Sequence, residues 1–268
     1  MSKMTNQDYL KGNQYKNPNK LESRLNLHQK FSTNLYGFHR WTFDQYNFTH
    51  NLSVLEVGCG SGELWLKNRE RIPTFKRVVL SDNSQGMIES VKKSLSSVLQ
   101  DKTEFAIFDV QQIPFEDNSF DLIIANHMLY HVPSVSKAIS EIYRVLNVGG
   151  SFFASTNGRN HMIELDNLMK EFDDFYENIR YDDLNFMLEN GLEKVKMFSS
   201  YKILRYEDSL KVTNAKDLVS YQISRMENSE TLKTEQGQKC LFNFFNTIIE
   251  EKGYIEITKD AGIIVAYK

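Results

Sequence analysis

Residues 54–62 of the chain read Val-Leu-Glu-Val-Gly-Cys-Gly-Ser-Gly. The apolar run at the start of this stretch is typical of a buried strand, and residues 63–66 behind it begin a helical pattern. Glycine permits a tight turn between the two and lets a ligand lie against bare backbone at the start of a helix. One glycine suffices for a simple turn, so the alternation of Gly58, Gly60 and Gly62 predicts a ligand-binding loop.

The spacing of these glycines separates two kinds of cofactor. A dinucleotide fingerprint has the form G-x-G-x-x-G, and its third glycine would fall at position 63, which is Glu63. The pyrophosphate of a dinucleotide also gains little from a neighbouring carboxylate such as Glu56. S-adenosylmethionine (SAM) carries an ammonium and a sulfonium, which carboxylates stabilise. The loop therefore favours SAM.

Short apolar runs alternate with helical patterns between residues 53 and 155. The runs are residues 54–57, 78–80, 105–108, 122–125 and 152–154. One helical pattern follows a candidate N-cap at Ser84, and another extends from Ser134 to the pair Gly149-Gly150. Strands that alternate with helices form βαβ units, so the sequence predicts an α/β fold with a doubly wound, mostly parallel sheet.

An aspartate ends each of the next two predicted strands. Asp82 lies about twenty residues beyond the glycine loop, where a carboxylate can accept hydrogen bonds from both ribose hydroxyls. Asp109 ends the third strand, and its carboxylate either takes the amino group of adenine or forms an Asx turn. Both positions are consistent with an adenosyl ligand.

The other regions surround this core. Residues 1–50 predict an N-terminal helical cap, and residues 51–156 the SAM-binding core. Residues 157–237 predict a substrate or lid insertion with a late strand, and residues 238–268 a C-terminal helix with antiparallel strands that complete the sheet. In that last region we expect two strands, 254–258 and 262–267, around a turn at residues 259–262. Further amphipathic helices are expected at 161–176 and 238–251.

Composition excludes several classes of protein. The 268 residues are 41% hydrophobic and 25% charged, as in ordinary globular proteins, and the net charge of −3 gives no whole-chain attraction to nucleic acid. The two cysteines, Cys59 and Cys240, lie far apart and predict a reducing compartment, without a disulfide framework or a metal site. The polar first residues lack the apolar core of a signal peptide, and no run approaches the ~18 apolar residues of a membrane span. We expect a cytoplasmic protein without a membrane partner; its oligomeric state is left open.

Four blocks of the sequence resemble the class I SAM-dependent methyltransferases, in particular the branch of ubiquinone/menaquinone-biosynthesis methyltransferases. The blocks are residues 55–62, 81–87, 108–115 and 120–150. The sequence departs from the family pattern at Asn147-Val148, where a lysine and a proline usually precede the paired glycines. The resemblance implies a Rossmann-like sheet of seven strands whose last strand pair is antiparallel.

The resemblance also implies which residues bind SAM and its product S-adenosylhomocysteine. Those implied at the methionine end are Glu56, Gly58, Gly60, Gly62 and Asn126. Those implied at the adenosine are Asp82 for the ribose, and Met87, Asp109 and Val110 for the adenine.

Methyl transfer from a sulfonium mainly requires that the acceptor be aligned and water excluded, and a base is needed only if the acceptor must lose a proton. His127 and His131 follow the fourth predicted strand on the ligand side of the sheet, and imidazoles have a pKa suited to a base. They are candidates either for catalysis or for a structural hydrogen bond. Candidates for acceptor contacts lie in the N-terminal helices and after the fifth strand: Arg24, His28, His39, Arg40, Trp41, Asn157, Arg159, Asn160 and His161.

The sequence thus predicts an enzyme that transfers a methyl group from SAM to a small-molecule acceptor, with residues 157–237 supplying the pocket. An RNA or protein methyltransferase is the alternative. A basic stripe would support RNA, and its candidate members are Lys194, Lys196, Lys202, Arg205 and Lys211. A nicotinamide- or flavin-dependent oxidoreductase is a more distant alternative, and a SAM-binding protein without catalysis would keep the same cofactor residues. The acceptor atom, O, N, S or C, is not indicated.

Overall fold

The structure is a computed structural model, and it describes residues 18–49, 51–95, 98, 102–173, 184–225 and 231–268. The strands are β1 (Ser53–Val57), β2 (Arg77–Asp82), β3 (Thr103–Ile107), β4 (Phe120–Asn126), β5 (Leu146–Asn157), β6 (Ser200–Val212) and β7 (Ile255–Tyr267). The helices are α2 (Pro18–Phe31), α3 (Phe38–Gln45), α4 (Glu63–Lys67), α5 (Gln85–Leu95), α6 (Val135–Val145), α7 (Ile163–Phe172), α8 (Leu188–Lys194), α9 (Ala215–Arg225) and α10 (Glu235–Lys252). Two 3₁₀ turns, η3 (Arg69–Arg71) and η4 (Leu129–His131), complete the described elements.

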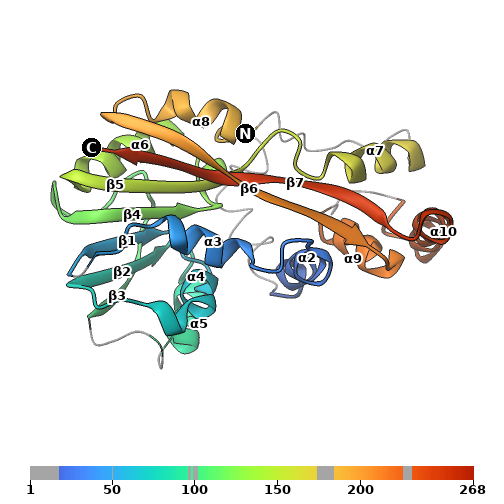
Figure 1. The fold of residues 1–268 in the computed structure, drawn as a ribbon. Coiled ribbons are helices and arrows are strands. Elements are labelled where there is room, and N and C mark those ends of the chain that lie inside the picture. Colours follow the sequence, from blue (N-terminus) through green and yellow to red (C-terminus); the bar gives the residue numbers. More distant parts are fainter. Residues whose placement is uncertain (1–17, 50, 96–97, 99–101, 174–183, 226–230) are drawn as a thin grey trace.

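The seven strands form one sheet in the order β3-β2-β1-β4-β5-β7-β6 (Figure 1). The strands from β3 to β5 are parallel to one another, and β7 runs antiparallel to both of its neighbours, β5 and β6. This confirms the predicted doubly wound sheet with an antiparallel end. The order reverses between β1 and β4, and in such sheets ligands bind at the carboxyl ends of the strands on either side of the reversal.

Helices cover both faces of the parallel strands, which explains their continuous apolar runs. Leu55 and Ile123 lie on the face that packs against α6 and α8, whereas Val54 and Leu122 lie on the face that packs against α3, α4 and α5. The predicted caps are confirmed in geometry, because Ser84 Oγ accepts from the Met87 amide and Ser134 Oγ from the Lys137 amide, both at 3.4 Å. Each cap satisfies an amide that the first helical turn leaves without a partner.

The predicted turn at residues 259–262 is wrong. Strand β7 continues through it without interruption and pairs with β6 along its full length of 13 residues. Lys259 forms an ion pair with Asp208 on β6, and Asp260 one with Arg205. A residue sequence typical of a turn is thus held extended by cross-strand charge pairs.

The boundary between α6 and β5 also differs from the prediction. We expected the helix to run to the glycine pair, but it ends at Val145, and Leu146 already pairs with Phe120 in the sheet. The glycines belong to the strand, where the amide of Gly149 donates to the carbonyl of Lys268. This contact with Lys268 holds the glycines in the sheet. A helical pattern among neighbouring residues cannot reveal a partner so far along the chain.

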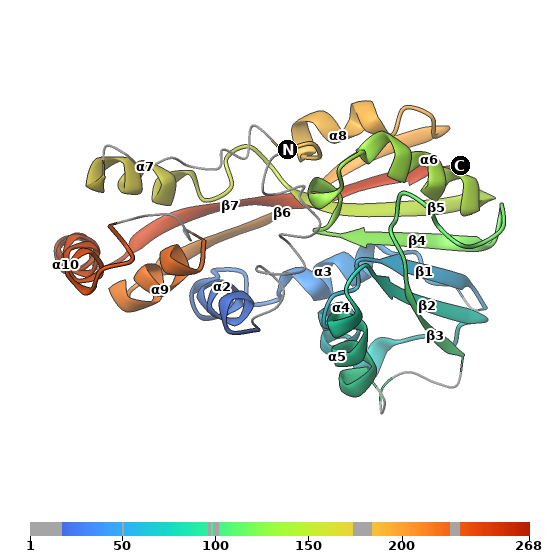
Figure 2. The same cartoon turned by 180° about the vertical axis from the view of Figure 1, so that it is seen from behind.

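Strands β6 and β7 extend past the rest of the sheet and carry a second group of helices (Figures 1 and 2). Only residues 261–267 of β7 pair with β5, so the first half of β7 has β6 as its sole strand neighbour in the described chain. A separate apolar cluster surrounds this extended half, with Leu27 from α2, Leu165 from α7, Leu218 from α9 and Leu241 from α10. This lobe combines α2, α7, α9 and α10 on the extended hairpin, so it includes residues from both sides of the region 157–237.

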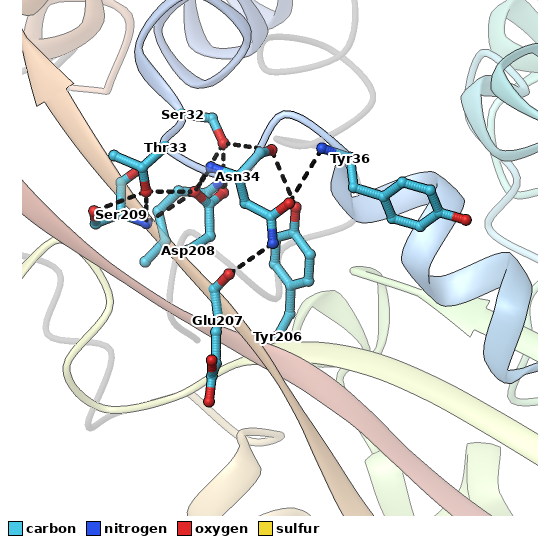
Figure 3. Close-up of polar contacts among 9 residues, drawn as sticks. Ser32, Thr33, Asn34, Tyr36, Tyr206, Glu207, Asp208 and Ser209 are labelled. Carbon is cyan, nitrogen blue, oxygen red and sulfur yellow. Dashed lines mark hydrogen bonds and ion pairs between the residues drawn. The ribbon is translucent and has the colours of Figure 1, made fainter.

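The segment that joins α2 to α3 is bound to β6 by Asp208, whose side chain is fully buried. Its carboxylate accepts hydrogen bonds from Ser32 Oγ at 2.8 Å and from the Asn34 amide at 3.0 Å (Figure 3). Asn34 in turn donates from Nδ2 to the carbonyl of Glu207 at 2.8 Å. These contacts fix where α3 begins, and α3 leads to the carboxyl ends of the strands.

In the part of the chain that the structure describes, no helix has the length and apolar character needed to cross a membrane. The division into four regions at residues 50, 156 and 237 stays a prediction. Of the predicted helix at 161–176, residues 163–172 are helical, and residues from 174 lie outside the described part.

Candidate functional site

The glycine loop leaves β1 with three residues in the left-handed region, at φ of 68° for Gly58, 53° for Gly60 and 83° for Gly62. A Cβ on Gly58 would lie 2.8 Å from the side chain of Met128, and one on Gly62 would lie 2.7 Å from Val91. A Cβ on Gly60 would meet no atom within 4 Å. Two of the glycines therefore serve close packing, and the middle one leaves open space beside the backbone, as a ligand-binding loop requires.

Asp82 is fixed at the end of β2 by the loop itself. Its Oδ2 accepts a hydrogen bond from the Gly60 amide at 3.0 Å, and its Oδ1 accepts one from the Ser84 amide at 2.9 Å. Each carboxylate oxygen can accept a second bond. The carboxylate is thus oriented beside the open face of Gly60.

Asp109 follows β3 and forms the Asx turn that the sequence left as an alternative. Its Oδ1 accepts from the Gln111 amide at 2.9 Å, and its Oδ2 accepts from Gln111 Nε2 at 2.9 Å. Val110, next in the chain, is buried in the cluster under α6. Met87 lies half-buried in the first turn of α5, and Ile88 takes the core position beside it.

Glu56 is a carboxylate with 2% exposure at the end of β1. Burial and, to a smaller extent, nearby Asp82 raise its pKa, the Trp65 hydrogen bond and the neighbouring Asn126 side chain lower it, and the net result is a pKa of about 7. The indole Nε1 of Trp65 donates to Glu56 Oε2 at 2.6 Å. Within the described residues no basic side chain forms an ion pair with Glu56. A ligand cation would supply the missing partner.

Asn126 ends β4 beside Glu56. The Oδ1 atom accepts a hydrogen bond from the Tyr46 hydroxyl at 3.0 Å. The Nδ2 atom is buried and makes no hydrogen bond in the structure, although the amide is near enough to stabilise the Glu56 carboxylate. A buried donor without an acceptor costs about 1–3 kcal/mol, so this atom marks a position that a ligand acceptor fits.

His127 directly follows β4 in a strained conformation, with φ at 50°. Its amide is locked by two bonds to Ser155, 3.0 Å to the carbonyl and 3.1 Å to Oγ. Burial, with smaller contributions from His39 and Lys259, lowers the pKa of His127 to about 3. The imidazole is therefore neutral at pH 7 and a weak base, which favours an orienting hydrogen bond over full removal of a proton.

An aromatic wall lies against His127, and we define it as Phe38, Trp41 and Tyr206. The ring of Phe38 is 5.0 Å from that of His127 and 5.3 Å from that of Tyr206. The rings of Trp41 and Tyr206 are 5.2 Å apart. The wall joins α3 to β6. The parallel core and the β6–β7 hairpin therefore meet where an acceptor would approach the cofactor site. Of the three residues of the wall, Trp41 is a predicted candidate for acceptor contacts, and no local pattern indicates that the three rings converge.

Other predicted acceptor residues lie farther along the same interface. His161 follows β5, and its ring stacks on that of His28 from α2 at 6.0 Å. His39 lies on α3, where its carbonyl accepts from Asn68 Nδ2 at 2.9 Å. His131 lies in η4, with its ring 4.5 Å from that of Tyr130. The side chain of Arg24 lies outside the described part, and Arg40, Arg159 and Asn160 are exposed.

Two of the candidate members of a basic stripe contact carboxylates. Arg205 contacts the carboxylates of Asp260 and Glu189, and Lys196 contacts that of Glu193. Among the described residues, no cluster of His, Cys, Asp and Glu side chains could hold a metal ion.

Two residues of the site had no signal of their role in the sequence. Trp65 lies in the helical pattern that begins at residue 63, and Tyr46 lies in the predicted N-terminal helical cap. Both bring a polar atom to the carboxyl ends of β1 and β4, because aromatic side chains can present one apolar surface and one polar tip. Only the fold reveals where those tips point.

The buried histidines predict that the protein loses stability in acid. Burial lowers the pKa of His28 to about 3 and of His39 to about 4, as it does for His127. The unfolded chain binds these protons near pH 6.5, so the free energy of unfolding falls as pH drops below about 6.5, by up to about 1.4 kcal/mol per pH unit for each imidazole. Glu56 acts in the opposite sense between its usual pKa and about 7, and offsets one of these groups.

Urea unfolding at about pH 7.5 and about pH 5.5 measures this effect. The free energy of unfolding should differ less between these two pH values in His28→Gln than in the unsubstituted protein. An unchanged difference would mean that His28 is protonated in the folded state.

Comparison with known proteins agrees with this geometry. A family model described as a methyltransferase domain matches residues 55–154. The chain thus carries a segment that is similar to methyltransferase domains. The match begins in β1 and ends in β5, so it spans the glycine loop, Asp82, Asp109 and His127.

Curated relatives of the methyltransferase domain include quinone and sterol enzymes. The demethylmenaquinone methyltransferase of Symbiobacterium thermophilum is 32% identical over 116 residues, which are 43% of this chain and 46% of that protein. The ubiquinone/menaquinone biosynthesis C-methyltransferase of Rickettsia prowazekii is 32% identical over 123 residues, 43% and 50% of the two chains. The sterol 4-C-methyltransferase of Caenorhabditis elegans is 28% identical over 145 residues, 54% and 41%. The chain thus spans about half the length of these relatives.

Solved structures share the fold well beyond the methyltransferase domain. The YcgJ protein of Bacillus subtilis matches with a TM-score of 0.58 at 16% identity, covering 86% of this chain and 97% of that one. Phosphoethanolamine N-methyltransferase 2 of Haemonchus contortus, in complex with SAM, matches with a TM-score of 0.58 at 17% identity, covering 100% and 60%.

Proposed function

We propose that the protein transfers a methyl group from SAM to a small-molecule acceptor. The observation that carries the proposal is the buried Glu56 carboxylate next to the glycine loop, which among the described residues accepts from the Trp65 indole and has no basic side chain as partner. A cationic ligand fits this position, and an anionic pyrophosphate does not. When bound, SAM supplies an electrophilic methyl group on its sulfonium.

The chain's own residues would hold this cofactor at both ends. Glu56 accepts from the ammonium, and Asn126 Nδ2 supplies a donor beside it. Asp82, oriented by the Gly60 and Ser84 amides, accepts from the ribose hydroxyls. Met87, Asp109 and Val110 are proposed at the adenine by the family resemblance.

We place the acceptor beside His127 and the aromatic wall, which are in contact with each other. This position adjoins Asn126 in the chain, and it is closed by α3 and β6, which lie outside the residues matched by the family model. Neutral His127 orients the acceptor through a hydrogen bond, and the aromatic rings exclude water from the displacement. His131, behind Tyr130, is proposed to support this segment. An acceptor enclosed in this way is a small molecule rather than RNA or a protein; a cytoplasmic location stays a prediction.

Thermal unfolding with separate ligands tests the cofactor. A ligand at one hundred times its dissociation constant adds about 2.7 kcal/mol to stability, so we expect SAM and S-adenosylhomocysteine to raise the midpoint while NADH, NADPH and FAD leave it unchanged. Stabilisation by a nicotinamide or flavin instead would overturn the proposal. Incorporation of labelled methyl groups from SAM into a panel of small molecules then tests turnover.

Asp82→Ala should abolish the stabilisation by SAM, because the ribose hydroxyls lose their acceptor. A matched control is Asp121→Ala at the opposite end of the sheet, where the carboxylate accepts from the Ser53 amide at 2.8 Å. Both variants lose a bond to a backbone amide, but we expect only Asp82→Ala to lose the ligand effect. Equal loss in both variants would assign the effect to the fold.

A further inference from the structure

Within the described residues, the Asn126 side chain has one hydrogen bond, which its oxygen, not its nitrogen, accepts from the Tyr46 hydroxyl. Tyr46 is 3% exposed and follows α3 as its C-cap. Its ring packs edge-on against Phe153 at 5.0 Å and Phe48 at 5.5 Å. The ring is thus held by apolar contacts, and the hydroxyl has a fixed position at the end of β4.

The register of the sheet determines which group the Asn126 nitrogen faces. Glu56 on β1 pairs with Ile124 on β4, and side chains two residues apart on a strand share a face, so Asn126 and Glu56 lie on the same face. The amide contributes to stabilising the Glu56 carboxylate. A reversed amide would turn its oxygen toward that carboxylate and place two acceptors together. The Tyr46 bond and the Glu56 charge therefore favour the same orientation.

The resulting pair is one donor and one acceptor, side by side and both buried. Asn126 Nδ2 has no hydrogen-bond partner, and Glu56 has no cationic partner, in the described part of the chain. The α-amino acid end of SAM carries the two complementary groups, a carboxylate and an ammonium. Each protein atom thus matches one charge of that zwitterion.

We propose that Tyr46 is a positioning residue that holds the Asn126 amide with Nδ2 toward the carboxylate of the bound amino acid. This inference rests on the proposed use of SAM. Through Tyr46, helix α3 determines whether the site recognises the whole zwitterion or the ammonium alone. The anchoring of the α2–α3 segment on Asp208 then contributes to cofactor recognition from the opposite lobe (Figure 3).

The experiment compares SAM with decarboxylated SAM, which keeps the ammonium, the sulfonium and the adenosine but lacks the carboxylate. Dissociation constants are measured by calorimetry for the unsubstituted protein and for Tyr46→Phe, which removes only the hydroxyl. We expect Tyr46→Phe to weaken SAM binding about tenfold and decarboxylated SAM binding less than about twofold. A merely structural role would weaken both ligands equally, and that result would overturn the inference.

Two further variants keep the result interpretable. Tyr221→Phe on α9 is the matched control, because Tyr221 is also 3% exposed, and it should leave both dissociation constants unchanged. In Asn126→Ala the preference for SAM should already be lost, and adding Tyr46→Phe should change it no further. An additional loss in the double variant would show that Tyr46 acts without Asn126. If the unsubstituted protein binds neither ligand, the proposed function fails, whereas binding of both with an equal loss in Tyr46→Phe defeats only this inference.

Discussion

Replacing Glu56 with glutamine is expected to weaken SAM binding by about 10- to 100-fold. A hydrogen bond to a charged group contributes about 1.5–3 kcal/mol, and the glutamine removes the charge while keeping the shape. Its oxygen can still accept from Trp65, and its NH₂ group would then face the ammonium of the ligand as a second donor. Calorimetric titration with SAM measures the loss.

Glu63→Gln provides the matched control for this substitution. Glu63 follows the same loop, but its carboxylate is partly exposed and lies 3.9 Å from the Lys67 ammonium. Exposed pairs of this kind contribute little, so we expect the SAM dissociation constant to change less than about twofold. If Glu56→Gln binds SAM as tightly as the unsubstituted protein, the cation site is elsewhere.

Two alanine substitutions in the glycine loop should separate folding from binding. In Gly62→Ala, a positive φ combines with a Cβ only 2.7 Å from Val91, and we expect a loss of about 3 kcal/mol in the free energy of unfolding. In Gly60→Ala the Cβ meets no atom within 4 Å. The left-handed backbone alone then lowers the free energy of unfolding, by about 1 kcal/mol. The added methyl group occupies the open side of the loop, and SAM binding should fall at least about tenfold.

Urea unfolding and SAM titration on the two variants measure these quantities separately. The expected pattern is a large stability loss in Gly62→Ala and a binding loss out of proportion to stability in Gly60→Ala. Normal SAM affinity in Gly60→Ala would mean that the ligand does not approach the loop at this residue.

The parallel core could be predicted because its signals are local. Apolar runs such as residues 122–125, helix caps such as Ser84 and the alternate glycines each depend on neighbours within a few positions. The errors at residues 146 and 259–262 have the opposite origin. There the chain is held by distant partners, Lys268 for the paired glycines and Asp208 for Lys259.

The candidate site divides in the same way. Asp82 could be named because it ends a predicted strand beyond the glycine loop, whereas Glu56 and Asn126 were implied by the family resemblance. Tyr46 and the aromatic wall could not be assigned, because their contacts join residues separated by the whole core, as between Tyr46 and Asn126 or between Phe38 and Tyr206. Only tertiary packing brings those pairs together.

The long β6–β7 hairpin has a consequence for how such a protein can diversify. The match to a methyltransferase domain covers residues 55–154. The outer halves of β6 and β7 lie outside it and, among the described strands, pair only with each other. Apart from Asp208, which holds the α2–α3 segment, substitutions in these outer halves leave the pairing of the parallel strands unchanged. If the acceptor binds where we propose, selection can change the lobe beside it while residues 55–154 stay nearly the same. Related proteins could then differ in their acceptors and share the cofactor site.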